Sequence, residues 1–217
     1  MRAARKPASS RRRSSPWSSL ATGFEAGLWM FSLAVLSIVA WMIADSYLYQ
    51  LRFRDQVGGA RAGRAASSQP AGSADRRSSL PPVALGNPLA RLSIPRLDVS
   101  VVVAEGTTTK VLRRAVGRVA SSVRPGPAEN IVLAGHRDTF FRPLEHIRKG
   151  DVIFVDSEAG RQTYGVEWTR IVDPGEVGVA AASGYPALTL VTCYPFRYVG
   201  NAPQRFVVRA RRLGPAD

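Results

Sequence analysis

The first long apolar run of the chain covers residues 26–44, which are 19 consecutive positions without a charged side chain. A helix that rises about 1.5 Å per residue over this run nearly spans a hydrocarbon core of about 30 Å. Trp29 and Trp41 lie near its ends, where aromatic residues anchor membrane helices. We therefore predict a single transmembrane helix. The alternatives are a buried core helix, unusual in so small a domain, and a signal peptide, whose cleavage site needs small residues.

The segments on either side of this run have no hydrophobic periodicity. Residues 45–84 are rich in Gly, Ser, Ala and Arg, which predicts a flexible linker, although the membrane helix can extend by two or three turns over residues 47–57. Residues 1–25 are basic and rich in Ser. Because basic flanks stay on the inner side, we predict a cytoplasmic tail and a single pass through the cytoplasmic (inner) membrane. Residues 85–217 then form an extracytoplasmic domain.

In this last part, the apolar positions mostly follow the two-residue period of strands. Turns rich in Gly and Pro separate the runs, and we expect strands at residues 90–94, 97–103, 131–135, 152–155, 161–172, 187–192 and 205–211. Short helical segments are expected at residues 111–116, with an N-cap among Thr107, Thr108 and Thr109, and at residues 140–147. Seven or eight short strands with one or two helices predict a mainly β fold, a closed β-barrel.

Charge and cysteine content exclude several classes of function. The formal net charge is +14, but many of the cations fall in the basic tail and in the linker. No zinc-finger spacing or recognition helix accompanies them, so we predict no nucleic-acid binding. One cysteine and two histidines exclude an internal disulfide framework, a cysteine-based metal cluster and a multi-histidine metal site.

Three predicted strands each carry one chemically active side chain near an end. Cys193 follows the strand at 187–192, His136 follows the strand at 131–135, and Arg205 opens the last strand. An imidazole can activate a thiol for attack on a carbonyl, and a guanidinium can hold the oxygen on which charge develops. For a lone cysteine, a small buried hydrophobic residue is the alternative interpretation. Spacing alone does not show that the three side chains meet.

The motifs around these residues resemble those of the sortases, which are membrane-anchored cysteine transpeptidases. Residues 188–193, Leu-Thr-Leu-Val-Thr-Cys, are similar to the sortase Thr-Leu-x-Thr-Cys motif, and residues 134–138, Ala-Gly-His-Arg-Asp, are similar to its histidine motif. Arg205 stands 12 positions after the cysteine, where the family has its arginine. Residues 135–144 and 192–196 look most like class D sortases. The resemblance covers about residues 89–211 and implies a sortase-like β-barrel.

The resemblance also implies the reaction and the role of each site residue. Cys193 would attack the peptide bond of a Leu-Pro-x-Thr-type sorting motif near the C-terminus of a secreted protein and form a thioester. His136 would act as acid and base, and Arg205 would bind substrate and stabilise the oxyanion. Thr192 would help to position substrate. The acyl group would pass to an amine of a peptidoglycan precursor or of another protein subunit.

No cofactor is expected from the sequence. Some sortases bind calcium, and Glu145, Asp151 and Asp156 are the carboxylates considered for such a site. Their spacing is not that of an EF-hand loop, so calcium activation is possible in the family but not indicated here.

Two other classes of function remain open at this stage. The first is a different cysteine enzyme, either a thiol peptidase or an L,D-transpeptidase; the latter places His and Gly before its cysteine, whereas Val191 and Thr192 stand here. The second is an anchored barrel that binds wall polymer without catalysis. His146 is not expected to be catalytic, and Asp138 is interpreted as a turn residue.

Overall fold

A computed structural model describes residues 16–64, 83–120, 122, 124, 130–181 and 183–214 of the chain. The chain divides into two compact units, residues 1–44 and 45–217. The predicted cytoplasmic tail falls mostly, at residues 1–15, outside the described residues, and so does the part of the predicted linker at residues 65–82.

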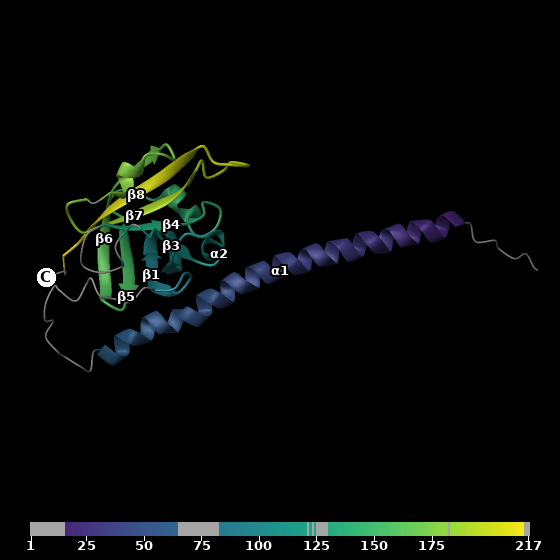
Figure 1. The fold of residues 1–217 in the computed structure, drawn as a ribbon, viewed down its shortest axis with the longest axis horizontal. Coiled ribbons are helices and arrows are strands. Elements are labelled where there is room, and N and C mark those ends of the chain that lie inside the picture. The colour runs from purple at the N-terminus through teal and green to yellow at the C-terminus, as the bar shows by residue number, and fades with distance from the viewer. Residues whose placement is uncertain are drawn as a thin grey trace, which may run out of the picture. The chain divides into compact units, whose positions relative to one another are not determined.

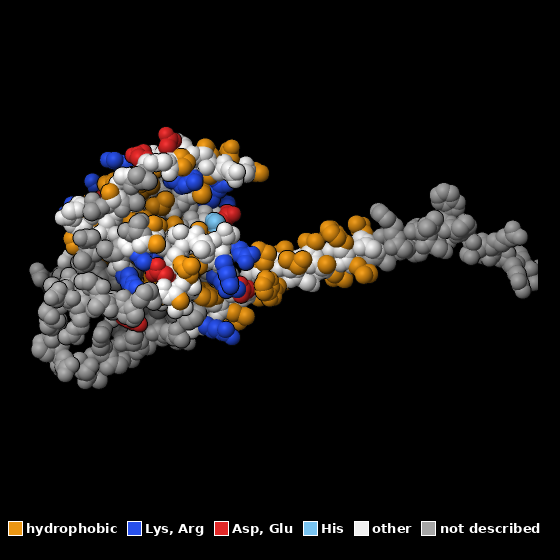
Figure 2. Space-filling view, in the orientation of Figure 1, with side chains coloured by type: hydrophobic (Ala, Val, Ile, Leu, Met, Phe, Trp, Pro, Cys, Tyr) orange, Lys and Arg blue, Asp and Glu red, His pale blue; other side chains and the backbone are white. Residues whose placement is uncertain are grey.

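The first unit is described from Pro16 onwards as helix α1 (Pro16–Arg64), which continues into the second unit. Hydrophobic side chains lie along this helix, as Figure 2 shows, and Trp29, Met30 and Phe31 are each about 70% exposed. The segment Gly27–Arg52 is, by length and composition, apolar enough to cross a membrane. Such exposure of large apolar side chains is unfavourable in water, so this surface needs an apolar environment.

The second unit is a closed eight-stranded barrel (Figure 1), which confirms the predicted mainly β fold. Its strands are β1 (Pro88–Ile94), β2 (Val99–Glu105), β3 (Val116–Arg118), β4 (Asn130–Ala134), β5 (Val152–Ser157), β6 (Gly160–Val172), β7 (Ala187–Tyr194) and β8 (Gln204–Arg212). Around the barrel they follow the order β1-β2-β3-β4-β7-β8-β6-β5. The β2–β3 and β4–β7 pairs are parallel, and the other pairs are antiparallel.

Short helices connect the strands: α2 (Thr109–Leu112), η2 (Pro95–Leu97), η3 (Arg142–His146) and η4 (Val177–Ala180). The predicted N-cap is confirmed at Thr108, whose hydroxyl accepts a hydrogen bond from the Val111 N–H at 3.4 Å. The predicted helix at residues 111–116 is wrong at its end, because Val116 already opens β3.

Strand β3 escaped prediction because it has only three residues and a glycine at its centre. Gly117 is required there by close packing, since a Cβ at this position would lie 2.3 Å from the carbonyl oxygen of Gly106. A three-residue strand has no recognisable apolar alternation, so only its pairing with β2 and β4 identifies it.

The barrel encloses one large apolar core. Its central side chains are fully buried and come from β1, β4, β5, β6 and β7; they include Leu92, Ile131, Ile153, Tyr164 and Leu188. Successive residues of a strand point to opposite faces, so the alternating patterns seen in the sequence become an apolar interior and a more polar exterior. Burial raises the pKa of Tyr164 to about 12.

Three side chains of α1 contact the barrel within the second unit, and we call this region the helix seam. Asp45 accepts hydrogen bonds from Arg114 Nε and Nη2 at 2.5 and 2.8 Å, and the Tyr49 hydroxyl donates to the Gly86 carbonyl at 2.6 Å. Gln50 donates to the Arg114 carbonyl at 2.7 Å and accepts from the Val102 N–H at 2.8 Å. Residues 45–50 therefore form a part of the barrel's structure, although the sequence predicts the linker to begin at residue 45.

Candidate functional site

The pairing of β4, β7 and β8 brings the three predicted site residues to one edge of the sheet. In the parallel β4–β7 pair, Ala134 lies opposite Val191. The next contact continues this register, because the Gly135 N–H donates to the Val191 carbonyl at 3.1 Å. His136 therefore leaves the sheet beside the end of β7, where Cys193 stands. Across the antiparallel β7–β8 pair, Cys193 lies directly opposite Arg205.

The alternation of side chains decides which face of the sheet these residues occupy. In β7 and β8, Leu188, Leu190 and Val208 belong to the interior core. Cys193 and Arg205 differ from them by an odd number of positions, so their side chains lie on the outer face. Cys193 is a free thiol and is partly exposed, as are His136 and Arg205. The three side chains can thus be reached by another molecule.

Beside these residues the same outer face of the sheet is apolar. Val132 of β4 and Val207 of β8 are almost fully buried, although they do not belong to the interior core, and Val191 of β7 is partly buried. Other parts of the protein therefore cover these valines, whereas the thiol, the imidazole and the guanidinium beside them stay partly exposed.

Gly135 allows the histidine turn to pack closely. A Cβ at this position would lie 2.7 to 3.0 Å from three ring atoms of Phe141, a fully buried core residue. The Phe141 N–H in turn donates to the His136 carbonyl at 3.1 Å. Replacing Gly135 would push the ring away and displace the turn that carries the imidazole. The Gly-His pair of the motif is therefore required by packing as well as by chemistry.

Thr192 belongs to β7, and its side chain lies on the inner face of the sheet. Its side chain is buried, and its hydroxyl donates to the Gly135 carbonyl at 2.8 Å. The bond ties the residue before Cys193 to the residue before His136. The substrate-binding role predicted for Thr192 stays a prediction, and the contact gives the residue a positioning role of its own.

Arg205 contacts its own loop in this structure. Its Nη1 donates to the carbonyls of Ala202 and Gln204 at 3.2 and 2.9 Å. Among the hydrogen bonds of the described residues, none uses its Nε or Nη2, so these donors are available to a substrate carbonyl. The fixed fork of a guanidinium allows one edge to bind the loop while the other binds a ligand.

Arg137 is a site neighbour that the sequence analysis missed. Its Nη2 donates to the carbonyls of Tyr198 and Gly200 at 2.8 and 3.0 Å, and its guanidinium lies 5.6 Å from the Tyr198 ring centroid. The residue after His136 thus holds the loop that joins Cys193 to Arg205. A basic residue next to the histidine was the only signal in the sequence, and it does not identify a backbone partner 61 residues away.

The loop between β6 and β7 is held by two buried polar side chains of the site strands. Asn130 donates to the Ala181 carbonyl at 3.0 Å and accepts from Thr189, and Arg209 donates to the Val179 carbonyl at 2.7 Å. Burial lowers the pKa of Arg209, whose guanidinium also lies 5.5 Å from the Trp168 ring centroid. The loop between β6 and β7 is therefore bound to β4 through Asn130 and to β8 through Arg209.

Two other polar residues discussed from the sequence are exposed. His146 lies at the end of η3, and its expected lack of a catalytic role stays a prediction. Asp138 lies in the turn that follows His136, as its interpretation as a turn residue predicts.

Arginines engage all three carboxylates that were considered for calcium. Arg96 binds Asp151 through two contacts of 2.5 Å, Arg161 binds Asp156 at 2.7 Å, and Arg197 lies 3.6 Å from Glu145. Among the described residues no group of three or more His, Cys, Asp or Glu side chains is arranged to hold a metal ion. In this structure a guanidinium therefore lies beside each of the three carboxylates.

Comparison with known proteins identifies the family. The family model of the sortase domain matches residues 92–213. Over 123 residues the chain is 37% identical to sortase D of Bacillus subtilis, which covers 56% of this chain and 62% of that protein. The chain spans between 47 and 62% of the length of the curated relatives it matches.

Solved structures share the fold. A Clostridium perfringens sortase D5 transpeptidase superposes with a TM-score of 0.61 at 21% identity, covering 79% of this chain and 99% of that one. A lid mutant of sortase A from Corynebacterium diphtheriae gives a TM-score of 0.57 at 25% identity, covering 76% of this chain and 96% of that one. The matching family model, the barrel and the strand-end residues together show that this chain belongs to the sortase family.

Proposed function

We propose that this chain is a membrane-anchored cysteine transpeptidase. It cleaves a Leu-Pro-x-Thr-type sorting motif near the C-terminus of secreted proteins and joins the acyl fragment to an amine. One observation carries the proposal: the β4–β7–β8 pairing places His136 beside the end of β7 and Arg205 directly opposite Cys193. Membership of the sortase family supports the same reaction class.

In the first half of the reaction, the Cys193 thiolate attacks the carbonyl carbon of the scissile peptide bond. The carbonyl oxygen gains negative charge, and the free edge of the Arg205 guanidinium donates hydrogen bonds to it. The His136 imidazolium then protonates the leaving amine as the C–N bond breaks. The products are a thioester on Cys193 and the released C-terminal segment.

In the second half, the acceptor amine attacks the thioester carbonyl. Neutral His136 takes the proton from the attacking amine, the C–S bond breaks, and the thiolate is regenerated. An amine of a peptidoglycan precursor or of a protein subunit yields a new amide bond, whereas water yields hydrolysis.

The location of the domain follows from the N-terminal helix in this proposal. The apolar helix would anchor the chain in the cytoplasmic membrane, and the basic residues before it would keep the N-terminus inside. The barrel would then meet its secreted substrates outside the cytoplasm. We also infer that the reaction needs no calcium, and the arginine-bound carboxylates support this inference.

The test uses the full chain in nanodiscs with a library of Leu-Pro-x-Thr-small peptides and a diamine acceptor, with and without EDTA. Mass spectrometry should find cleavage after the threonine, a thioester on Cys193 and the amine-joined product, all absent in Cys193→Ala and unchanged by EDTA. Hydrolysis without a joined product for any amine would instead indicate a thiol peptidase. A Cys193 that no peptide acylates would contradict the proposal and favour a binding module.

A further inference from the structure

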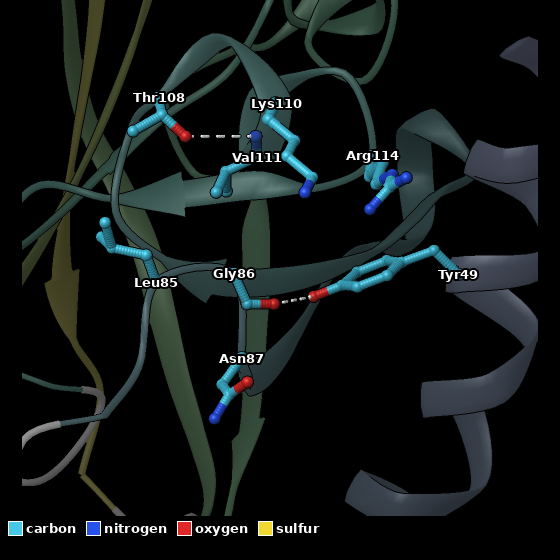
Figure 3. Close-up of a pocket in the computed structure, with 8 residues that line it drawn as sticks. All are labelled: Tyr49, Leu85, Gly86, Asn87, Thr108, Lys110, Val111 and Arg114. Carbon is cyan, nitrogen blue, oxygen red and sulfur yellow. Dashed lines mark hydrogen bonds between the residues drawn. The ribbon is translucent and has the colours of Figure 1, made fainter.

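A pocket of about 350 Å³ lies next to the helix seam. Figure 3 shows its walls, which come from α1, from the turn before β1 and from the segment around α2. The lining residues are Tyr49, Leu85, Gly86, Asn87, Thr108, Lys110, Val111 and Arg114. All of them belong to the second compact unit. None of the catalytic residues lines the pocket, so the proposed reaction does not explain it.

The wall of the pocket is built as a fixed surface. The Tyr49 hydroxyl is bound to the Gly86 carbonyl, and the Gly86 N–H donates to the Glu105 carbonyl at 2.8 Å. Gly86 has a φ of +83°, a backbone conformation that glycine adopts without strain. The Thr108 hydroxyl is bound to the backbone of α2. These bonds fix Tyr49, Gly86 and Thr108 in the wall of the pocket, and none of them uses the Lys110 ammonium.

The charge of the pocket is positive. Lys110 and Arg114 line it, and no acidic side chain does. The two bonds from Arg114 to Asp45 offset the charge of that guanidinium, so the net positive charge comes from Lys110, which is exposed and forms no side-chain hydrogen bond or ion pair within the described residues. The Lys110 ammonium is therefore free to bind an anion. Leu85 and Val111 add apolar surface beside the two cations.

Chain connectivity keeps this pocket close to the bilayer. Tyr49 follows Ala44, the last residue of the uncharged stretch, by five positions. Five residues span at most about 18 Å even when fully extended. The headgroup regions add roughly 10–15 Å in total to a hydrocarbon core of about 30 Å. A membrane-anchored chain therefore keeps Tyr49, one wall of the pocket, within about 18 Å of the end of the uncharged stretch.

We propose that this pocket binds the phosphate-bearing headgroup of an anionic phospholipid. The Lys110 ammonium binds the phosphate, and Nη1 of Arg114, which Asp45 does not use, donates to it. Thr108 and Asn87 are the polar side chains beside it, and Leu85 and Val111 contact the first carbons of the lipid. At about 30 Å³ per water, the pocket holds on the order of ten water molecules, the size of a phosphoglycerol group. The proposal rests on the proposed membrane anchoring but not on the proposed catalytic reaction.

The test counts lipids that stay bound to the full chain. The protein is placed in nanodiscs of equal parts phosphatidylglycerol and phosphatidylcholine, and the lipids retained on release are counted by native mass spectrometry. Wild type should retain phosphatidylglycerol preferentially. Lys110→Glu should lower that preference about five- to tenfold, since a surface cation contributes about 1 kcal/mol to anionic-lipid binding. Lys110→Arg should keep the preference.

Lys149→Glu is the matched control, because Lys149 is exposed and lies in the turn before β5, outside the pocket. If Lys149→Glu and Lys110→Glu lowered the preference for phosphatidylglycerol equally, the overall charge of the protein would explain that preference, and the proposed site would be overturned. A soluble phosphate ligand would be indicated if free glycerol phosphate displaced the lipid at comparable concentration, which would also overturn the lipid assignment. A chain that never enters a nanodisc would refute the anchoring as well, while peptide joining in detergent would show that the catalytic proposal survives.

Discussion

We call the end of β4, β7 and β8 that carries His136, Cys193 and Arg205 the catalytic edge, after its proposed role. The catalytic edge and the helix seam both bring together residues far apart in the sequence, but they do so by different means. At the catalytic edge, backbone pairing of β4, β7 and β8 fixes the positions, and the side chains of Cys193 and Arg205 remain partly exposed. At the helix seam, the side chains themselves make the connection, as in the two-point contact of Asp45 with Arg114.

Because of this difference, substitutions in the two regions should affect different quantities. A substitution at the catalytic edge leaves the strand pairing intact, because the ladder does not depend on the exposed side chain. A substitution at the helix seam removes the contact itself. We therefore expect the first kind to change turnover at nearly constant stability and the second to change stability at nearly constant turnover.

Arg205→Lys should give the largest effect of the substitutions considered. Lysine lacks the fixed fork that contacts the loop and the substrate oxygen together, so kcat/KM should fall about 10²- to 10³-fold with little change in Tm. Arg211→Lys is the matched control, because Arg211 also lies on β8 but its guanidinium binds Glu167 at 2.7 Å. The measurement is peptide joining followed by mass spectrometry. Near-normal turnover in Arg205→Lys would remove the guanidinium from the mechanism.

Thr192→Val should change both stability and turnover, because Thr192 is buried and its hydroxyl binds the residue before His136. Loss of its hydroxyl leaves the Gly135 carbonyl without that partner, so unfolding should cost about 1–3 kcal/mol less and kcat/KM should fall about tenfold. Thr192→Ser should recover most of both. Urea unfolding and the joining assay measure the two quantities. A stability loss without any change in kcat/KM would show that the hydroxyl does not position the histidine.

Asp45→Asn should affect the helix seam alone. Asp45 and Arg114 are 29% and 27% exposed, so weakening their contact should reduce the free energy of unfolding by about 1 kcal/mol. Turnover should stay within about twofold, because the seam's hydrogen bonds among the described residues do not involve Cys193, His136 or Arg205. Thermal unfolding of the full chain in nanodiscs gives the stability, with the exposed Asp173→Asn as control. A fall in turnover larger than the fall in stability would show that the seam communicates with the site.

Asp151→Asn should have the smallest effect on turnover, and its effect on stability should depend on pH. Hydrogen bonds from Arg96 lower the pKa of Asp151 below its ordinary value, and the Arg148 N–H adds to this. The folded carboxylate therefore contributes stability above about pH 4, and this contribution is lost as the pH falls through the lowered pKa. The variant should be less stable than wild type at pH 7, and the two should converge in acid. Urea unfolding at both pH values measures the gap, and a constant gap would contradict the assigned ion pair.

Much of the barrel could be predicted because its strands are long enough to show a pattern. β6, β7 and β8 run for 13, 8 and 9 residues, and their apolar alternation gives both the element and its inner face. The candidate site residues came from motif and chemistry, since the chain has one cysteine and two histidines, and their catalytic roles stay a prediction. β3 and the helix seam were not, because a three-residue strand and a few polar side chains carry no periodic signal.

The sequence by itself determined the apolar N-terminal helix, the strand-rich domain and the identity of the thiol, imidazole and guanidinium. Those features depend on local composition and on residue type. The tertiary structure alone decided that Cys193 lies opposite Arg205, that Arg137 holds the loop between them, and that Lys110 and Arg114 share a pocket. Each of these depends on which strands and turns become neighbours. That choice is made by burying one common core, whose free energy is summed over the whole domain and is not encoded in any single stretch of the chain.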